Sequence, residues 1–458
     1  MKWSSRFKKK INKNFISYTN SIKFDRKFFH IDLLCCYAHA EILKNSEVIK
    51  KKELKKLKKC ILDIKKKKIK LKLRKNLEDI HLNIENLIIK KEKKIGNKIR
   101  TARSRNDLVT TELRFFIKKK TEKIFKTLKK LIYKILCICK KKIDVIMPSF
   151  THMQIAQPTL LSHHLLAYKE MFLRDLKRLK YSYKSADYLI LGSCAVVGTS
   201  IRVDREELKK KLGFKKVNRN SLDGVSDRDY VIDFCHSCSM IMMHISRMSE
   251  EFIIWSSKIF DFIELPDEYS SGSSMMPQKK NPDIFEVSRS RTSLVVSNLI
   301  SIYSIMKCLP LSYNKDYQED KRISFSTYKI TLETLKIFNK IIKKIKFNKK
   351  KMFNSSKKDF SLATDIAEKM TKEGVPYKKA HKTVSSIVSK YGKYKEFKKI
   401  PSFFFLKNGL KKKTINWIKK LTIKKSIKSK KNIGNTSIKL VKYEIKMSKK
   451  KIRKVKIH

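Results

Sequence analysis

The sequence predicts an all-α fold with three helical domains, of which the central one is a bundle of long helices. Only 10 glycines and 8 prolines occur in 458 residues. Four long stretches contain neither residue: 97–147, 225–265, 283–309 and 311–373. Folds made of strands and turns need more of these residues to reverse the chain direction. Long uninterrupted helices are therefore the structure that the sequence favours.

The clearest helix is expected over 226–260. Its apolar residues recur at alternating intervals of three and four, the pattern of a helix that packs along its neighbours at a shallow angle. Ser226 or Asp227 can cap the start of this helix, and Pro266 would end the pattern. The apolar positions are Val231, Phe234, Cys238, Ile241, Ile245, Met248, Phe252, Trp255 and Ile259.

Four further long helices are expected in the middle of the chain. Pro282 and Asp283 suit the first turn of one of them, since proline tolerates that position and a carboxylate favours the positive end of the helix dipole. Five long helices predict a bundle, and the breadth of their apolar faces predicts that several copies of the chain associate. The four helices cover about 104–142, 158–185, 282–308 and 316 into the 340s.

Both ends of the chain show helical patterns that are shorter than those of the central helices. The first hundred residues predict short helices, including a basic stretch at 50–75 that suits a solvated helix face. Later in the chain, helices are expected at 361–373 and 377–391, whereas the lysine-dense tail at 410–458 gives few signals. The predicted domains are 1–104, 105–355 and 356–458.

The formal net charge is +69, from 111 lysines and arginines against 42 aspartates and glutamates. One interpretation is a protein that binds nucleic acid or another polyanion. The other is a drift in composition toward lysine, isoleucine, asparagine and phenylalanine. The lysines are dispersed and form no aromatic-interleaved RNA-binding motif, so we favour drift and expect no specific nucleic-acid partner. Weak, salt-dependent polyanion binding stays open.

Cysteine usage and hydropathy indicate a reducing, cytoplasmic location. The nine cysteines are irregularly spaced, which argues against a disulfide framework. Cys235 and Cys238 are the first and last residues of a Cys-His-Ser-Cys run inside a long helical pattern. The chain has no second pair of metal-ligand residues to match it, so we expect these cysteines to pack in the core rather than bind a metal. No apolar run of about 18 residues predicts a membrane span. Residues 1–30 carry charges throughout, so we expect no secretory signal.

Five polar clusters stand out from the lysine-rich background. The first, 101–107, places two guanidinium groups, a carboxylate and three neutral hydrogen-bonding side chains in seven residues. Arginine binds carboxylates through paired hydrogen bonds, although a helix cap by Ser104 and Asp107 explains the same residues. The second, 149–158, sets His152 among hydrogen-bonding side chains on a loop before a helix. Histidine exchanges protons near neutral pH, so His152 is a candidate acid or base.

The other three clusters are 220–229, 272–281 and 313–321. Taken alone, the first and last are typical of a helix-capping loop and a solvated charge run. The run 272–281 is the most informative in the chain, because it combines a glycine, paired serines, a proline and a lysine. Such a loop can bind a carboxylate and stabilise negative charge that develops on it, with Lys279 as the cation. Its serines can donate hydrogen bonds or, if deprotonated, accept a proton.

Taken together and in order, the five clusters resemble those of the argininosuccinate lyases, within the fumarase/aspartase superfamily. The Gly-Ser-Ser-x-Met-Pro run indicates only the superfamily. Three other strings are more specific, because they favour argininosuccinate lyase over fumarase, aspartase and adenylosuccinate lyase. They are Arg-Ser-Arg-Asn-Asp, Gln-Lys-Lys-Asn-Pro-Asp and Tyr-Asn-Lys-Asp-x-Gln-Glu-Asp-Lys. The resemblance runs from residue 3 to about 385, and more weakly to 437. Its other segments are Trp3–Phe7, Ser21–Asp25, Glu78–His81, Gly198–Thr199, Asp204–Glu206 and Gly374–His381.

The resemblance implies reversible elimination of argininosuccinate to arginine and fumarate, the last step of arginine biosynthesis. It also implies a cytoplasmic homotetramer with a twenty-helix core, active sites shared between three chains, and no metal or organic cofactor. Ser273 and His152 would be the proton-transfer pair, in an order left open, with Glu286 orienting His152. Lys279 and Asn281 would meet the charge that develops on the substrate. The remaining substrate contacts would be Ser21, Arg103, Asn106, Thr151, Tyr313, Gln318 and Lys321.

The chain departs from the family pattern at several positions. Ala102 and Cys194 stand where glycine is usual, Ser4 and Ser5 replace a glycine pair, and Arg100 replaces a common histidine. Three alternatives remain open. Another fumarate-forming lyase is disfavoured by the last polar cluster. A binding or structural protein of the same fold would not need the catalytic candidates, and the third alternative is a polyanion-binding protein.

Overall fold

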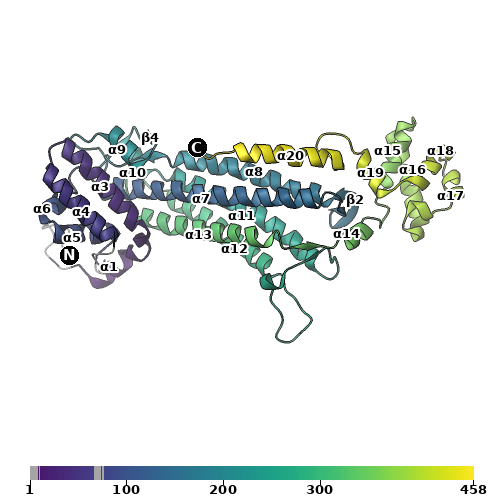
Figure 1. The fold of residues 1–458 in the computed structure, drawn as a ribbon, viewed down its shortest axis with the longest axis horizontal. Helices are drawn as coiled ribbons and strands as arrows, with labels where there is room; N and C mark the ends of the chain where they lie inside the picture. The colour runs from purple at the N-terminus through teal and green to yellow at the C-terminus, as the bar shows by residue number, and fades with distance from the viewer. Residues whose placement is uncertain (1–8, 10, 67–73, 75–76) are drawn as a thin grey trace.

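A computed structural model describes residues 9, 11–66, 74 and 77–458. The Trp3–Phe7 segment, with Ser4 and Ser5, and part of the basic stretch at 50–75 lie outside the described residues. The described chain is an elongated helical molecule with short-helix regions at both ends of a long bundle (Figure 1). Its strands form three two-stranded sheets. The predicted all-α class with a central long-helix bundle is therefore confirmed.

Five long helices form the bundle, as the sequence predicts. Each buries an apolar face in the core of the bundle. None of these, nor any other helix in the described ranges, is long and apolar enough to cross a membrane. The five are α7 (Arg105–Lys141), α8 (Leu161–Ser185), α11 (Asp229–Ser256), α12 (Asp283–Met306) and α13 (Gln318–Ile341).

Helix α11 lies at the centre of the bundle, where it packs against α8, α12 and α13. The predicted apolar seam is buried along this helix from Val231 to Trp255. The predicted ends are wrong, because the chain turns after Ser256 and leaves Ile259 86% exposed. That turn lets the Phe262 N–H donate to the Trp255 carbonyl at 2.9 Å. Cys235 and Cys238 are buried in the core, as expected.

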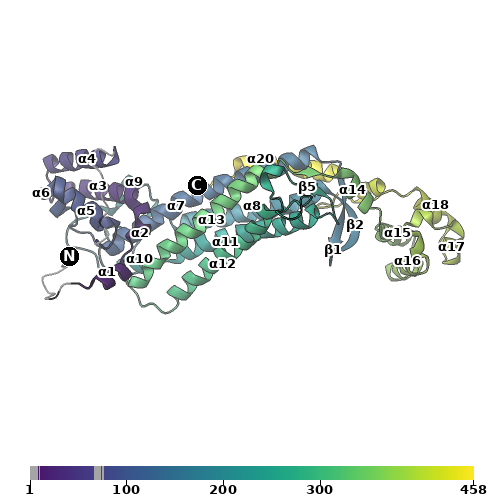
Figure 2. The same ribbon diagram turned by 90° about the horizontal axis from the view of Figure 1, so that it is seen from below.

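A β-hairpin connects α7 to α8. Strand β1 (Ile146–Thr151) pairs antiparallel with β2 (Gln154–Leu160). The prediction that a helix begins at 158 is wrong by three residues, because Thr159 and Leu160 pair with Met147 and Ile146. Figure 2 shows the hairpin extending from the bundle beside α14 (Lys349–Ser355), which packs on β1.

Short helices form the N-terminal region, and their apolar side chains join the main core of the molecule. They are α1 (Lys13–Thr19), α2 (Ile22–Asp25), η1 (Arg26–Phe28), α3 (Phe29–Asn45), α4 (Lys51–Lys65), α5 (Ile80–Lys91) and α6 (Lys93–Lys98). Further short elements connect the long helices: β3 (Tyr188–Leu189), α9 (Arg205–Leu212), β4 (Lys216–Val217), α10 (Ser221–Ser226), β5 (Ile263–Glu264), η2 (Asp267–Tyr269), η3 (Lys315–Tyr317) and β6 (Lys346–Phe347).

The C-terminal region has its own hydrophobic core, which extends from Phe360 to Leu421. Its elements are α15 (Ala363–Lys372), α16 (Tyr377–Tyr391), η4 (Gly392–Tyr394), η5 (Phe397–Lys399), α17 (Ser402–Lys407) and α18 (Lys412–Lys420). The helices expected at 361–373 and 377–391 correspond to α15 and α16.

The lysine-dense tail forms two further helices, α19 (Ile423–Ser429) and α20 (Ile438–Lys454). Helix α20 returns along α7 and α8 (Figure 1) and buries Val441, Ile445 and Ile452 in the main core. Buried Lys169 on α8 lies 2.7 Å from Glu444 on α20. The tail therefore packs on the central bundle, and the predicted domain boundaries stay a prediction.

Candidate active site

His152 lies at the tip of the β1–β2 hairpin rather than on the loop that the sequence predicts. Thr151 and Gln154 pair across the tip, which leaves His152 and Met153 as a two-residue turn with φ of 51° and 60°. Positive φ at both positions is the type I′ geometry that matches the twist of a hairpin. The ring of Phe150 packs on that of Phe260, with centroids 5.7 Å apart. The hairpin is thus anchored in the core while His152 and Thr151 are exposed.

The 272–281 loop projects from the bundle between η2 and α12 (Figure 1). An isolated β-bridge between Ser271 and Asn281 closes its neck. Ser273 Oγ accepts hydrogen bonds from the backbone N–H groups of Met275 and Met276, at 3.3 and 3.1 Å. This turn fixes the Ser273 side chain, which is half-buried, while Lys279 is exposed.

Asn281 and Lys280 hold the base of this loop. The Asn281 side-chain amide donates to Ser271 Oγ at 3.3 Å, and Lys280 Nζ lies 2.6 Å from Asp267 Oδ1. Glu286 is exposed on the first turn of α12. Among the described residues no hydrogen bond joins Glu286 or Ser273 to His152. The predicted proton-transfer pair therefore makes no contact within one chain.

The other predicted substrate contacts gather around the first turns of α7 and α13, at the far end of the bundle. Asn106 Nδ2 donates to the Ala195 carbonyl at 3.1 Å, and Arg103 Nη1 donates to Cys36 Sγ at 3.1 Å. In the amide orientation that satisfies its neighbours, Gln318 donates to the Thr19 carbonyl at 3.2 Å. The α7 cap predicted from Ser104 and Asp107 is present as a capping box.

Lys321 and Ser21 meet at a buried carboxylate. Lys321 Nζ lies 3.0 Å from Asp25 Oδ1, and the Ser21 hydroxyl donates to the other oxygen of Asp25. Burial lowers the pKa of Lys321, but the charges of Asp25 and Asp320 and the contact with Asp25 together outweigh burial and raise the pKa. Burial raises the pKa of Tyr313, and the nearby Lys321 charge opposes that rise. Three predicted contacts thus gather around one buried carboxylate, Asp25.

A second buried ion pair lies beside this group. Arg228 Nε donates to Asp320 Oδ2 at 2.5 Å, and both side chains are fully buried. The Arg228 guanidinium also stacks over the Tyr317 ring, 4.3 Å from its centroid. Asp25, Arg228 and Asp320 were not predicted as site residues. Arg228 and Asp320 lie in two of the polar clusters and Asp25 lies in the Ser21–Asp25 segment, but a charged residue in this lysine-rich chain gives no sign of burial.

Comparison with known proteins identifies the family. The chain matches the family model described as Lyase over residues 5–297, and the one described as Argininosuccinate lyase C-terminal over residues 360–402. Argininosuccinate lyase from Pelagibacter ubique is 41% identical over 456 residues, which cover 98% of each protein. The one from Alkaliphilus metalliredigens is 43% identical over 390 residues, 84% of each. The chain belongs to the argininosuccinate lyase family. Its predicted family and its enzyme class, a lyase, are confirmed.

Solved structures confirm the fold of this argininosuccinate lyase family member. EDDS lyase in complex with formate aligns with a TM-score of 0.81 at 21% identity, over 94% of this chain and 87% of that chain. Class II fumarase from Schistosoma mansoni aligns with a TM-score of 0.71 at 18% identity, over 80% of this chain and 84% of that chain. At these identities the likeness concerns the helical architecture alone.

In this argininosuccinate lyase family member, the predicted site residues form two groups at opposite ends of the bundle. Asn106 lies at the start of α7, whereas His152 follows the end of that helix. With 37 residues, α7 is about 55 Å long at 1.5 Å per residue. The 272–281 loop belongs to the His152 end, because β5 pairs with β6, and α14, which follows β6, packs on β1. No substrate of ordinary size spans both groups in one chain.

Two departures from the family pattern carry backbone strain. Ala102 and Cys194, which stand where glycine is usual, have φ of 54° and 55°. A side chain in this left-handed region costs about 1–2 kcal/mol relative to glycine. Both residues flank Asn106: Ala102 precedes the α7 cap, and Cys194 N–H donates to Asp107 Oδ2 at 2.8 Å. These two strained residues therefore lie beside a predicted substrate contact.

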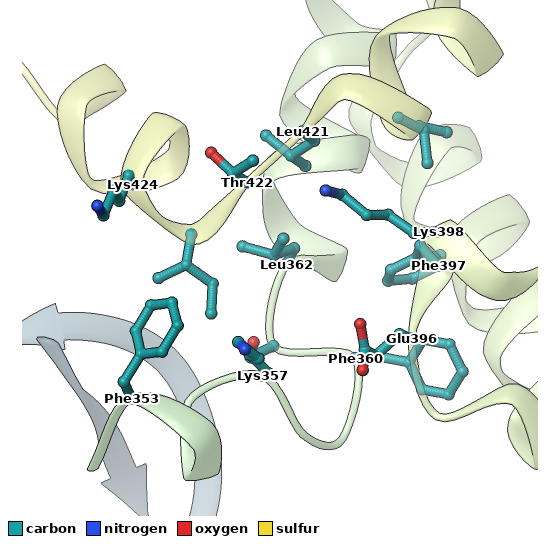
Figure 3. Close-up of a pocket in the computed structure, with 13 residues that line it drawn as sticks. Phe353, Lys357, Phe360, Leu362, Glu396, Phe397, Lys398, Leu421, Thr422 and Lys424 are labelled. Carbon is teal, nitrogen blue, oxygen red and sulfur yellow. The ribbon is translucent and has the colours of Figure 1, made fainter. Parts of the chain in front are cut away.

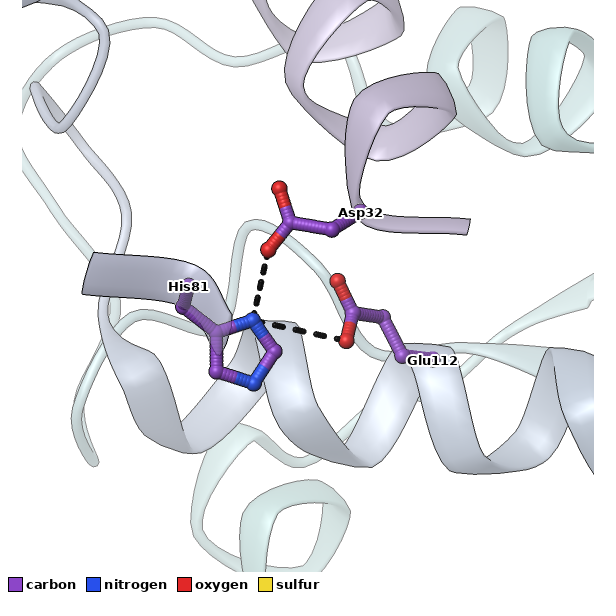
Figure 4. A group of neighbouring side chains, drawn as sticks. All are labelled: Asp32, His81 and Glu112. Atoms are coloured by element: carbon purple, nitrogen blue, oxygen red, sulfur yellow. Dashed lines mark hydrogen bonds and ion pairs between the residues drawn. The ribbon is translucent and has the colours of Figure 1, made fainter. Parts of the chain in front are cut away.

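One group of side chains in the described chain has donor atoms spaced as a metal ion requires: Asp32, His81 and Glu112, within 4.8 Å of one another (Figure 4). His81 Nδ1 lies 2.6 Å from Asp32 Oδ2. Burial would raise the pKa of Asp32, but the hydrogen bond from His81 lowers it, whereas burial and Asp32 raise the pKa of Glu112 well above its usual range. The hydrogen bond between His81 and Asp32 is short, and the positive charge of Arg103 lies nearby. Both favour a buried cluster whose members share a proton over a metal site.

Proposed function

We propose that this protein catalyses the reversible elimination of argininosuccinate to arginine and fumarate, the last step of arginine biosynthesis, in the cytoplasm. Family membership supports the reaction, and the exposed Ser273 loop and His152 turn supply the groups that it needs. The observation that carries the proposal is the outward placement of both segments at one end of the bundle, where a neighbouring chain can complete the site.

The reaction removes a proton from the carbon next to a carboxylate and expels a guanidinium nitrogen that gains a proton. We infer that Ser273 and His152 carry these two protons. The difficult species is the carbanion, whose charge spreads into the carboxylate. Lys279 and the Asn281 amide are proposed to meet that charge; one preorganised donor is typically worth about 3–4 kcal/mol.

The proposed site needs several chains. Asn106, Ser21, Tyr313, Gln318 and Lys321 lie far from His152 in one chain, so we propose a homotetramer whose active sites each draw on three chains. Arg103 and Thr151 are assigned to the same sites, and Glu286 is proposed to orient His152 from another chain. No metal or organic cofactor takes part in the proposed reaction.

Exposed apolar side chains on α12 support this assembly. Val287 and Leu294, on one side of the helix, are 48% and 56% exposed, and Ile300 and Tyr303, on the other side, are 60% and 51% exposed. Large apolar side chains exposed on both sides of one helix mark a protein interface more often than a solvated surface. Packing α12 between other copies of the chain would cover these side chains and bring the two ends of different bundles together.

The test is fumarate release, followed by ultraviolet absorbance. Purified protein is offered argininosuccinate, adenylosuccinate, malate and aspartate separately. Activity on argininosuccinate alone is expected. Loss of Ser273 as an acid or base should lower turnover by about 10²–10⁴-fold in Ser273→Ala. The adjacent Ser274→Ala is the matched control, because Ser274 is exposed on the same loop.

Two results would overturn the proposal. Release from adenylosuccinate or malate in preference to argininosuccinate would assign a different lyase reaction. No release from any of the four, in a sample that light scattering shows to be a tetramer, would indicate a protein that keeps the fold without the activity.

A further inference from the structure

A cavity of about 280 Å³ lies between the two hydrophobic cores of the chain (Figure 3). Ile423 belongs to the main core, with Phe353 packed against it, whereas Phe360, Phe397 and Leu421 belong to the C-terminal core. The chain crosses twice between the cores at this point, once before α15 and once after α18. Ligand sites are commonly found at boundaries of this kind, where two packed units leave a concave apolar surface.

Three of the four charged side chains that line this cavity are cationic. Lys357, Lys398 and Lys424 line it and are exposed. Figure 3 shows the side chain of Lys398 reaching over the apolar floor, and the Lys357 ammonium lies 4.5 Å from the Phe353 ring centroid. The lining contains one carboxylate, Glu396, which lies 3.5 Å from Lys399. In the described chain no carboxylate pairs with Lys398 or Lys424.

We propose that this cavity binds a small amphipathic carboxylate. The apolar body would fill the space between Phe353, Phe397 and Leu421, and its carboxylate would meet the ammonium group of Lys398, while Lys424 on the opposite side of the cavity adds a longer-range attraction. An uncharged apolar molecule would gain neither attraction, and a compact polar anion would leave the aromatic floor in contact with water. The site is distinct from the proposed active site, since none of its lining residues lies in the five polar clusters.

The experiment is calorimetric titration of the full-length protein with octanoate at physiological salt. One saturable site per chain is expected. 1-Octanol, with the same tail and no charge, and acetate, with the charge and no tail, should each bind at least about tenfold more weakly. Lys398→Gln with Lys424→Gln should weaken octanoate binding about tenfold, since the ion pair with Lys398 and the attraction of Lys424 are both lost.

The matched control is Lys382→Gln with Lys390→Gln, two exposed lysines of the same region that do not line the cavity. This control should bind octanoate like the original protein. Leu362→Trp, which fills the cavity, should abolish binding, and circular dichroism checks that each variant is folded. Absence of a saturable site, equal affinity in both double lysine variants, or full binding by a folded Leu362→Trp protein would each overturn the proposal.

Discussion

Lys321 Nζ lies 3.0 Å from Asp25 Oδ1, and neither side chain reaches the solvent. The lysine is predicted to contact substrate, yet its charge is already balanced by a carboxylate of the same chain. A buried ion pair loses several kcal/mol when only one member is removed, because the other charge is left uncompensated. Structural and substrate-binding roles of Lys321 can therefore be separated.

Replacing Lys321 with glutamine should lower both stability and activity. The expected loss is roughly 3–5 kcal/mol in the free energy of unfolding, from the unpaired Asp25. The double variant Asp25→Asn with Lys321→Gln should regain much of that stability in urea unfolding but not the activity. Lys329→Gln, an exposed site on the same helix, is the control and should change neither. Recovery of activity in the double variant would assign Lys321 a purely structural role.

Because the predicted site residues lie at opposite ends of the bundle, two inactive variants should restore activity to each other when they form mixed tetramers. His152→Asn and Asn106→Leu proteins should each be inactive alone. When they are unfolded and refolded together, about one site in four should contain an intact His152 and an intact Asn106 from different chains. Activity near that fraction, measured as fumarate release, is expected. Activity no higher than that of the separate variants would mean that each site takes both residues from one chain.

Acid should weaken the N-terminal region through His39. Burial, with the Arg103 charge, lowers the pKa of this histidine to about 4, although His39 Nε2 donates to the Thr101 carbonyl. Between pH 6.5 and 4 the unfolded chain binds a proton that the folded chain does not, so stability falls as the pH decreases. Over this range the free energy of unfolding falls by at most about 3 kcal/mol.

His39→Gln keeps a donor for the Thr101 carbonyl but does not titrate. It should flatten the dependence of the unfolding free energy on pH in this window. The exposed His30→Gln is the control and should leave the slope unchanged. An unchanged slope in His39→Gln would show that other groups cause the acid sensitivity.

Glycine at position 102 should stabilise the protein. Ala102 has φ of 54°, and relief of that strain exceeds the entropy that glycine adds to the unfolded chain. The expected net gain is about 0.5–1 kcal/mol. Ala38→Gly, inside α3, should instead cost about 1 kcal/mol. Thermal unfolding of the two variants in parallel tests the sign, and a loss in both would mean that the Ala102 methyl packs better than its backbone suggests.

The long helices could be predicted because their signals are local. Runs without glycine or proline and a regular apolar spacing locate α7, α8, α11, α12 and α13 to within a few residues. The hairpin at His152 gave no such signal, because its turn uses His152 and Met153 where glycine or asparagine is usual, and Pro148 and Pro158 lie within its strands. Helix α20 was not predicted, because its many lysines obscure the apolar pattern, although its buried residues recur at a helical spacing.

The sequence predicts which clusters belong to the site, but not how these clusters are arranged in space. Sequence order places Asn106, His152 and Ser273 in separate segments and gives no distance between them. The predicted helix over 104–142 already separates the first two, but only the structure places the Ser273 loop at the His152 end of the bundle. Asp25 and Arg228 were missed for a different reason, since their importance lies in burial against Lys321 and Asp320, which depends on contacts far apart in the chain.

The return of α20 along α7 has a consequence for synthesis. Lys129 on α7 donates to the Val455 carbonyl, a contact between residues 326 positions apart. During synthesis α7 emerges from the ribosome long before α20, so the apolar flank that Val441, Ile445 and Ile452 cover stays exposed until α20 has emerged. The bundle can therefore bury this flank only after about 300 further residues have been made.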